Sequence, residues 1–290
     1  MKDDQSPRFI PARQCPVCLG RPVSINLDRL YRCASCGLIL NERTHSRQED
    51  EADYRGKVFD TPARVVHQQW QWFQTARGEH GTGRLLDIGC GTGRFPAQAS
   101  QYGWEAWGLE LSPGGAAQAG ERLGSRAVCV SLYDWTPPVD GFEAITLWDV
   151  LDYLGDLRLA ATRLTAWLRP GGTLVVRVRN AAWHVPFIRL YRAAQPVFRL
   201  VGLGRSPAVI HRHGFTVPSL VGLLQRAGLQ DITVQPATVT RGNRSRVWVS
   251  PLLEGVLTVA ARLADRIGDW TGYRWYPTPS ILVTARRPNV

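Results

Sequence analysis

Residues 85–95 read LLDIGCGTGRF, an apolar run that meets an acidic residue and then a loop of alternating glycines. The apolar residues predict a buried strand, and the glycines permit a tight turn and a close backbone approach to a ligand before a helix begins near Arg94. A dinucleotide-binding loop follows the pattern GxGxxG, whose third glycine would fall on Arg94. Asp87 also places a carboxylate where a pyrophosphate would be repelled. The loop therefore favours a ligand that carries an ammonium or sulfonium group.

Four further pieces follow this loop in chain order. Glu110 ends the next apolar segment, residues 105–112, and lies 23 residues after Asp87. Asp134 follows a third segment, with Leu132 and Tyr133 beside it. The fourth segment spans residues 144–154, and residues 168–176 read LRPGGTLVV, a turn that leads into a fifth strand.

This order of pieces resembles the class I S-adenosylmethionine (SAM) dependent methyltransferases over roughly residues 84 to 180. The resemblance implies an α/β fold, a Rossmann-like and mostly parallel seven-stranded sheet with helices on both faces. It implies SAM as cofactor, with Glu110 on the ribose hydroxyls and Asp134 on the adenine amino group. The expected cofactor-binding residues are Tyr54, Asp87, Gly89, Cys90, Gly91, Gly93, Glu110, Leu111, Leu132, Tyr133, Asp134 and Trp148. Glycines and acidic residues also occur in ordinary turns, so that interpretation stays open for each of them.

Two C-x-x-C pairs, Cys15 with Cys18 and Cys33 with Cys36, are separated by fourteen residues. This spacing is typical of tetrahedral Zn²⁺ held by four thiolates. The N-terminal residues lack the layout of a secretory signal, so we expect reduced thiols and a cytoplasmic protein. The sequence therefore predicts a structural Zn²⁺ in a zinc ribbon, and it predicts Cys90 and Cys129 as buried thiols.

The chain has 290 residues, of which 44% are hydrophobic, enough for one α/β domain and a small metal module. We predict a zinc ribbon at 1–42, a linker and lid helix at 43–80, and a methyltransferase domain at 81–290 with helical inserts near 183–205 and 250–276. Expected helices are 61–78, 94–102, 114–123, 156–167 and 217–227, and the last strands are 231–237 and 280–286. No apolar stretch is long enough to predict a membrane span.

Residues 157–230 contain eleven arginines and no acidic residue, whereas the whole chain has a net charge of +11. In similar proteins this half of the domain lines the substrate side of the cleft, which indicates an anionic substrate or an anionic surface. Residues 183–201 alternate apolar and basic side chains at helical spacing. This insert is interpreted as a cap packed on the domain, as a contact to lipid headgroups or a lipid-linked substrate at the inner membrane face, or as a nucleic-acid contact. The oligomeric state is not predicted.

SAM is already activated, so the protein must chiefly align an acceptor in line with the methyl group and exclude water. For a hydroxyl acceptor the candidate bases are His211, Asp149, Asp152 and His184, with His213 nearby. His211 comes first because residues 211–220 resemble a segment of related enzymes in which a histidine precedes a phenylalanine by four residues. Quinone O-methyltransferases of similar fold hold a metal with two acids and a histidine, but here Tyr153 replaces that histidine, so we expect no metal assistance.

Three functions remain open. The favoured one is methyl transfer to a small-molecule, sugar, glycan or lipid-linked acceptor, with a hydroxyl as the expected acceptor group. Positive charge also suits methylation of a ribosomal or transfer RNA base. Against RNA, the ribbon is not especially basic and residues 144–154 lack an Asn-Pro-Pro-Tyr type signature. The third function is a non-catalytic scaffold that binds SAM, which intact Asp87, Glu110 and glycines disfavour.

Overall fold

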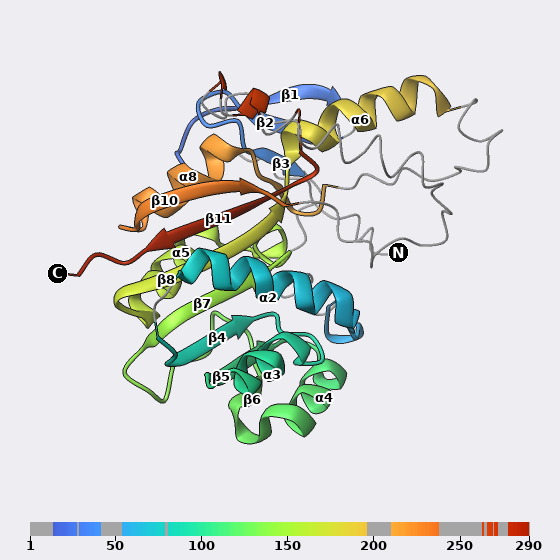
Figure 1. Cartoon of the computed structure of the whole chain (residues 1–290). Coiled ribbons are helices and arrows are strands. Elements are labelled where there is room, and N and C mark those ends of the chain that lie inside the picture. The colour runs from blue at the N-terminus through green and yellow to red at the C-terminus, as the bar shows by residue number, and fades with distance from the viewer. Residues whose placement is uncertain are drawn as a thin grey trace, which may run out of the picture.

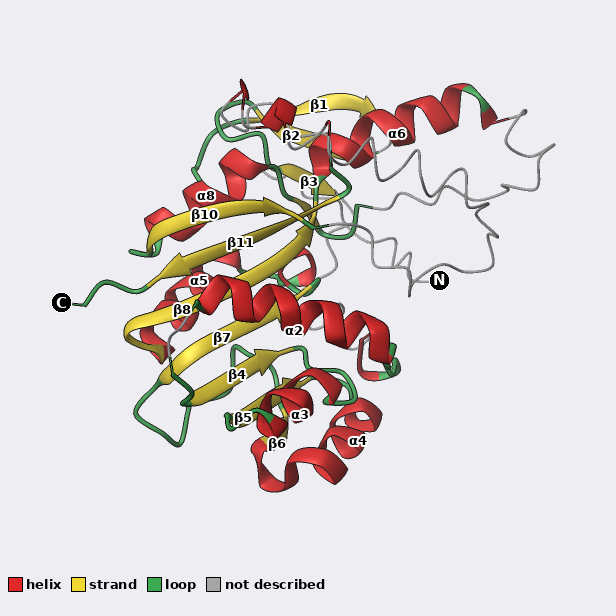
Figure 2. Cartoon of the chain, in the orientation of Figure 1, coloured by secondary structure: helices red, strands yellow, loops and turns green. Residues whose placement is uncertain are grey.

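The computed structural model describes residues 14–27, 29–41, 54–78, 81–195, 210–237, 263, 266–268, 270–271 and 278–289. A central twisted sheet lies between helices, and a smaller sheet formed mainly by the N-terminal segment lies at one edge of it (Figure 1). The helices and strands are distinguished by colour in Figure 2.

The large sheet has seven strands in the order β10-β11-β8-β7-β4-β5-β6. Their bounds are β4 Arg84–Ile88, β5 Glu105–Glu110, β6 Ala127–Cys129, β7 Phe142–Trp148, β8 Leu168–Arg179, β10 Gln230–Pro236 and β11 Ser280–Arg286. Strand β11 pairs antiparallel with both β8 and β10, and all other pairs in this sheet are parallel. The central strands are almost continuously apolar because helices cover both faces. The chain leaves β4 toward β5 on one side and later returns to β7 on the other, so the carboxyl end of β4 is a switch point where α/β proteins bind ligands.

Helices α2 Ala63–Arg77, α3 Arg94–Gln101 and α4 Pro113–Leu123 cover one face of the sheet. Helices α5 Leu157–Trp167 and α8 Val217–Arg226 cover the other. Local caps set two of these helix starts: Ser112 Oγ accepts from the backbone N–H of Gly115, and the Asp156 carboxylate accepts from that of Leu159. Short 3₁₀ turns, η1 Gly124–Arg126 and η2 Leu151–Tyr153, follow α4 and β7.

The predicted seven-stranded, mostly parallel sheet is confirmed, and the expected helices begin and end within two residues of those observed. One loop differs from the sequence-based expectation. The fourth segment was expected at 144–154, but its strand ends at Trp148, because Asp149 adopts a φ of 58° and η2 follows. The third strand ends at Cys129, and residues 130–135 form the turn after it. Cys90 is buried as predicted, but the prediction for Cys129 was wrong. It is exposed because β6 is a short edge strand.

The second sheet joins the N-terminal segment to the middle of the chain. Strands β1 Pro22–Leu27, β2 Leu30–Cys33 and β3 Ile39–Asn41 form an antiparallel ribbon, and β9 His213–Gly214 adds to β3 as a fourth strand. The ribbon residues Val17, Leu38 and Leu40 share one buried cluster with Phe215 and Leu220. The predicted boundary between a ribbon at 1–42 and the following segments stays a prediction.

Helix α6 Ala181–Ala193 is the described part of the first predicted insert. Its buried Ala181 and Ile188 pack in one cluster with Leu27, Leu30 and Ile39 of the ribbon. This packing agrees with the interpretation of the insert as a cap. Residues 196–205 of that insert, and most of the second insert at 250–276, lie outside the described residues. Across the described part of the chain, no helix is long and apolar enough to cross a membrane.

Candidate active site

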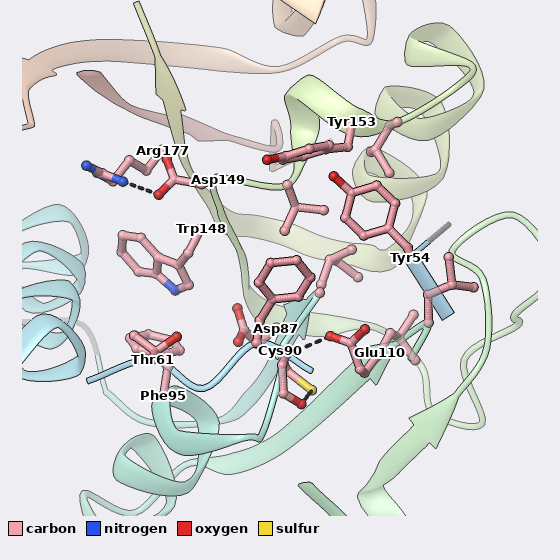
Figure 3. Close-up of a pocket in the computed structure, with 18 of the residues that line it drawn as sticks. Tyr54, Thr61, Asp87, Cys90, Phe95, Glu110, Trp148, Asp149, Tyr153 and Arg177 are labelled. Carbon is pink, nitrogen blue, oxygen red and sulfur yellow. Dashed lines mark hydrogen bonds and ion pairs between the residues drawn. The ribbon is translucent and has the colours of Figure 1, made fainter. Parts of the chain in front are cut away.

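A cavity of about 810 Å³ opens over the carboxyl ends of the central strands (Figure 3). One end, here called the glycine-loop end, is formed by residues at the carboxyl ends of β4 and β5, by the loops that follow these strands and by the turn after β6. The opposite end, here called the histidine end, is formed by residues from the chain before α2, from the ends of β7 and β8, from α6 and from the segment before β9. The glycine-loop end consists of Asp87, Gly89, Cys90, Gly91, Glu110, Leu111, Leu132 and Tyr133, and the histidine end of Tyr54, Asp149, Tyr153, Arg177, Arg179, His184 and His211.

The glycine loop needs residues without a side chain at two positions. Gly89 has a φ of 68°, and a Cβ there would lie 2.5 Å from a Val150 methyl group. Gly91 has a φ of 56°, and a Cβ there would lie 2.4 Å from the Phe59 carbonyl oxygen. Either substitution would strain the backbone and displace the neighbouring segment. Gly93 does not line the cavity; it is the N-cap of α3.

Glu110 links the end of β5 to the glycine loop. Its two carboxylate oxygens accept the backbone N–H groups of Gly91 and Ser112, each at 2.8 Å. These bonds fix the plane of a buried carboxylate that lines the cavity. Each oxygen keeps a second lone pair for a ligand hydroxyl, because a carboxylate oxygen can accept more than one hydrogen bond.

Asp87 lies on the floor of the same end of the cavity, at the position shown in Figure 3. It is almost completely buried and accepts a hydrogen bond from Thr146 Oγ1 at 2.6 Å. Burial raises the pKa of this carboxyl to about 8, with the charge of Glu110 adding to the shift. A cation bound beside Asp87 would favour its ionised form.

The turn after β6 supplies the apolar wall of the glycine-loop end. Leu132 and Tyr133 are buried and line the cavity. Arg163 of α5 braces the turn by donating to the carbonyls of Leu132 and Trp135, at 3.3 and 3.1 Å. Asp134 is exposed and is not part of the cavity lining. Its expected contact with adenine stays a prediction.

The segment before α2 crosses the glycine loop. The Thr92 N–H donates to the Phe59 carbonyl at 3.2 Å, and Thr92 Oγ1 donates to Asp60 Oδ1 at 2.7 Å. Asp60 also forms an exposed ion pair with Arg94 at 2.6 Å. Sequence reasoning placed a lid helix here and named Tyr54, but it missed Phe59 and Asp60, because no local pattern indicates which loop they contact.

Three polar side chains meet at the histidine end. His211 Nε2 lies 2.6 Å from Tyr153 Oη and 2.6 Å from Arg179 Nη1. The guanidinium can only donate, so Nε2 accepts, which assigns the neutral imidazole with its proton on Nδ1. Burial and the charge of Arg179 lower the pKa of His211 to about 3. Tyr54 packs edge-on against Tyr153, with ring centroids 4.9 Å apart, and both rings face the cavity (Figure 3).

The other predicted catalytic residues have different surroundings. Asp149 lines the cavity and pairs with Arg177, as Figure 3 shows. His184 also lines it, but its Nε2 donates to the Pro279 carbonyl at 2.9 Å, and burial lowers its pKa to about 4. Asp152 is buried outside the lining, and burial raises its pKa to about 7. His213 is buried and donates from Nε2 to the Leu154 carbonyl at 3.1 Å. The structure therefore brings His211, Asp149 and His184 to one cavity and leaves Asp152 behind its wall.

Four buried polar atoms on residues of the cavity wall have no hydrogen-bond partner within the described residues: Gln69 Oε1, Trp148 Nε1, Asp149 Oδ1 and Arg177 Nε. Burying an unpaired polar atom is costly, so these atoms are suited to meet polar groups of a ligand. Trp148 was expected from the sequence. Gln69 was not, since a glutamine in a helix is ordinarily a surface residue.

Arginines of the acid-free stretch serve different purposes. Arg177 and Arg179 line the cavity. Others hold the fold together: Arg158 Nε donates to the Pro16 carbonyl at 2.9 Å, and Arg189 Nη2 donates to the Ile25 carbonyl at 3.1 Å. Part of the positive charge that was expected to recognise the substrate therefore connects helices α5 and α6 to the ribbon. Arg199 and Arg205 lie outside the described residues.

The four cysteines of the ribbon converge. Their sulfur atoms all lie within 4.8 Å of one another, with 3.5 Å between Cys15 and Cys36 and 3.4 Å between Cys18 and Cys33. The backbone N–H of Val17 points to the sulfur of Cys15 at 3.4 Å. This cluster is separate from the large cavity.

The fold and the cavity define the class. A seven-stranded sheet of this order, with an acidic residue and a glycine loop after β4 and a second acidic residue at the end of β5, is that of a class I SAM-dependent methyltransferase. Residues 54–234 match the family described as "Methyltransferase domain". The chain belongs to this methyltransferase family.

Known relatives agree with this assignment. The chain is 30% identical to the biotin biosynthesis bifunctional protein BioCD of Bordetella avium over 71% of its own length and 46% of the relative. It is 28% identical to a ubiquinone biosynthesis O-methyltransferase of a Bradyrhizobium species over 34% of its length and 41% of that protein. The matches thus span less than half the length of these curated relatives.

Solved structures show the same fold. A SAM-dependent methyltransferase from Mesorhizobium loti superposes with a TM-score of 0.50 at 21% identity, over 76% of this chain and 97% of that one. Phosphoethanolamine N-methyltransferase 2 of Haemonchus contortus, in complex with SAM, gives a TM-score of 0.52 at 15% identity, over 86% of this chain and 62% of that one.

Proposed function

We propose that this methyltransferase binds SAM at the glycine-loop end of the cavity and transfers its methyl group to a small-molecule, sugar, glycan or lipid-linked acceptor held at the histidine end. The observation that carries the proposal is that one continuous cavity contains both ends. Its volume of about 810 Å³ lies in the range of small-molecule and cofactor sites, roughly 300–1,000 Å³. A cofactor and a small acceptor group can therefore meet without crossing bulk water.

The cofactor would use the residues named from the sequence. The fixed carboxylate of Glu110 suits two ribose hydroxyls, and Leu132 and Tyr133 suit the faces of a purine. The unpartnered Gln69 Oε1 and Trp148 Nε1 suit the amino-acid part of SAM, which carries both an ammonium and a carboxylate. The positive charge of the ligand is matched by the buried carboxyl of Asp87.

The histidine end favours an anionic acceptor. Arg177 and Arg179 reach this end, and Asp149, the one carboxylate that the described residues contribute to its lining, is already paired with Arg177. An acceptor carrying a carboxylate or phosphate would therefore enter a site of positive charge.

Most of the rate acceleration is proposed to come from alignment of the acceptor with the methyl group of SAM, and little of it from base catalysis. His211 is neutral at pH 7, and its Nε2 already accepts from Tyr153 and Arg179. We therefore assign His211 to orienting Tyr153, whose hydroxyl would contact an acceptor hydroxyl. The SAM sulfonium is a good leaving group, so the acceptor oxygen displaces it directly and the acceptor proton is lost to solvent. Divalent-metal assistance is not part of this proposal, since Tyr153 stands where quinone O-methyltransferases have a ligand histidine.

Structural Zn²⁺ is proposed for the cysteine cluster. Four thiolates at about 2.3 Å from zinc in a tetrahedron stand about 3.8 Å apart, close to the sulfur separations observed. The N–H of Val17 directed at the sulfur of Cys15 would stabilise a thiolate. The metal would fold the ribbon and take no part in methyl transfer, because all four positions around it are filled by sulfur.

Incubation of the protein with methyl-labelled SAM and a fractionated cell extract tests the function. We expect label in a small-molecule or lipid-linked fraction, and none with Glu110→Ala, which disables the cofactor end. Label in RNA would favour the alternative of an RNA base methyltransferase, and that binding would fall steeply with salt. Binding of SAM without any labelled product would favour the scaffold. Flotation with anionic vesicles would separately test peripheral membrane contact.

A further inference from the structure

The backbone that carries His211 lies between the ribbon and the end of β7. On the ribbon side, β9 pairs with β3 through Leu40 and His213 and through Ile39 and Gly214. On the other side, His213 Nε2 donates to the carbonyl of Leu154, the residue next to Tyr153. This short strand thus connects the cysteine ribbon with the turn that supplies the tyrosine of the histidine end.

Asn41, the last residue of β3, contacts this backbone on both sides of His211. Its backbone N–H donates to the Arg212 carbonyl at 3.1 Å, and its side-chain Nδ2 donates to the Ile210 carbonyl at 3.0 Å. Through these two bonds a single residue of the ribbon holds the carbonyl groups of Ile210 and Arg212, the residues before and after His211. No feature of the sequence pattern indicated Asn41, because the contact spans 169 positions along the chain.

The position of His211 matters because its ring nitrogen meets two groups from separate elements. Arg179 ends β8, where Ser280 of β11 is its register partner, and Tyr153 ends η2. Both reach Nε2 at 2.6 Å. A displacement of about 1 Å in the 210–212 backbone would break these bonds, since hydrogen bonds weaken steeply with distance and angle.

We propose that Asn41 of the cysteine ribbon is a positioning residue of the histidine end: it holds residues 210–212 so that His211 keeps Tyr153 and Arg179 in the arrangement that receives the acceptor. The ribbon then helps to hold the residues of the acceptor site in position. The proposal rests on the proposed function in taking the histidine end as the acceptor site. The structural part of the proposal, that Asn41 determines the hydrogen bonds and solvent exposure of His211, can be tested without any acceptor.

The first test is selective ¹⁵N-histidine NMR of the full-length, metal-loaded protein, with the His211 signal assigned by His211→Gln. In the unaltered protein we expect the neutral tautomer with the proton on Nδ1 and no titration of His211 between pH 5 and 8. In Asn41→Ala the His211 ring should gain solvent contact and titrate toward the ordinary histidine pKa of about 6.5. Asn41→Asp keeps the shape of the side chain but removes the donor, so it should give the same change.

The second test separates the two ends of the cavity. Both Asn41 variants should bind S-adenosylhomocysteine within about twofold of the unaltered protein, whereas KM for the labelled acceptor fraction should rise roughly 10-fold or more with a smaller change in kcat. Val23→Ala, an exposed change on β1 of the same ribbon, should alter neither measurement. On a His211→Gln background the KM effect of Asn41→Ala should largely disappear.

An unchanged His211 signal in both Asn41 variants would overturn the proposal. So would a parallel loss of S-adenosylhomocysteine affinity, which would give Asn41 a role in the whole fold. If no acceptor is ever labelled, the proposed function fails, whereas the NMR result still decides whether Asn41 positions His211.

Discussion

The two ends of the cavity are built in different ways. Apart from packing by the lid, the glycine-loop end comes from residues 87–133, where consecutive strands deliver their carboxyl ends to one edge of the sheet. The histidine end gathers residues from 54, 149–155, 177–184, 211 and 279–280, and the ribbon supports one of them. The first end is fixed by the βαβ repeat of the fold. The histidine end depends on long-range packing. Substitutions there can therefore alter which acceptor is bound without altering the residues that bind the cofactor.

Because the two ends are built differently, substitutions at one end should change cofactor binding and substitutions at the other should change acceptor methylation. Removal of the metal from the ribbon should have the largest effect of all. Structural zinc supplies on the order of 10 kcal/mol to small metal-folded modules. Cys33→Ser should therefore disorder the ribbon, abolish acceptor methylation and reduce bound zinc, measured by elemental analysis and activity. Retention of the wild-type zinc content and of full activity would contradict the metal assignment.

Loss of Glu110 should be the next largest effect, confined to the cofactor. Glu110→Ala removes the acceptor of two backbone N–H groups and the proposed ribose partner. Losing such a buried charged hydrogen-bonding group costs about 2–4 kcal/mol, or roughly 30- to 1,000-fold in S-adenosylhomocysteine affinity. Calorimetric titration measures this effect, and His211→Gln is the matched control that should leave the affinity intact. An equal loss of S-adenosylhomocysteine affinity in both variants would contradict the assignment of the cofactor to the glycine-loop end alone.

A pH effect should distinguish Asp87 from the histidines. The pKa of Asp87 is raised to about 8 by burial, so at pH 7 the carboxyl is mostly protonated in the free protein. Bound SAM favours the ionised form of Asp87, so binding at pH 7 should release a proton. The affinity for SAM should therefore rise as the pH approaches 8 and level off above it. Calorimetry in two buffers of different ionisation enthalpy measures the release. Asp87→Asn should abolish it, and persistence of the release in that variant would assign it elsewhere.

The segment before α2 should show the smallest effect. Asp60→Ala removes one hydrogen bond to Thr92 and an exposed ion pair with Arg94. Exposed pairs contribute about 0–1 kcal/mol and a hydrogen bond about 1 kcal/mol. We expect S-adenosylhomocysteine to bind roughly 3- to 10-fold more weakly, mainly through faster dissociation in stopped-flow measurements. A change in acceptor KM alone would contradict the assignment of this segment to the cofactor end of the cavity.

The contrast between local motifs and long-range contacts also explains which features could be predicted from the sequence. Strand order, helix positions and the lining residues Asp87, Gly91 and Glu110 follow from short motifs whose spacing is set by one βαβ unit. The ribbon's cysteines converge because their spacing permits it. Local features of this kind can be predicted from the amino-acid sequence alone.

Contacts across the chain were not predictable in this way. The addition of β9 to the ribbon, Asn41 beside His211 and Asp60 on the glycine loop each join segments that are more than 30 positions apart. No periodicity records such a contact. His211 was expected as a base, but its chemistry is set by Arg179, a neighbour that only the packing of β8 brings within 2.6 Å.

A crystal structure with bound S-adenosylhomocysteine tests the division of the cavity most directly. We expect the ribose hydroxyls on Glu110, the purine beside Leu132 and Tyr133, and the sulfur directed toward Tyr153 and His211. A ligand with its nucleoside at the histidine end, or an empty glycine-loop end at saturating ligand, would contradict it.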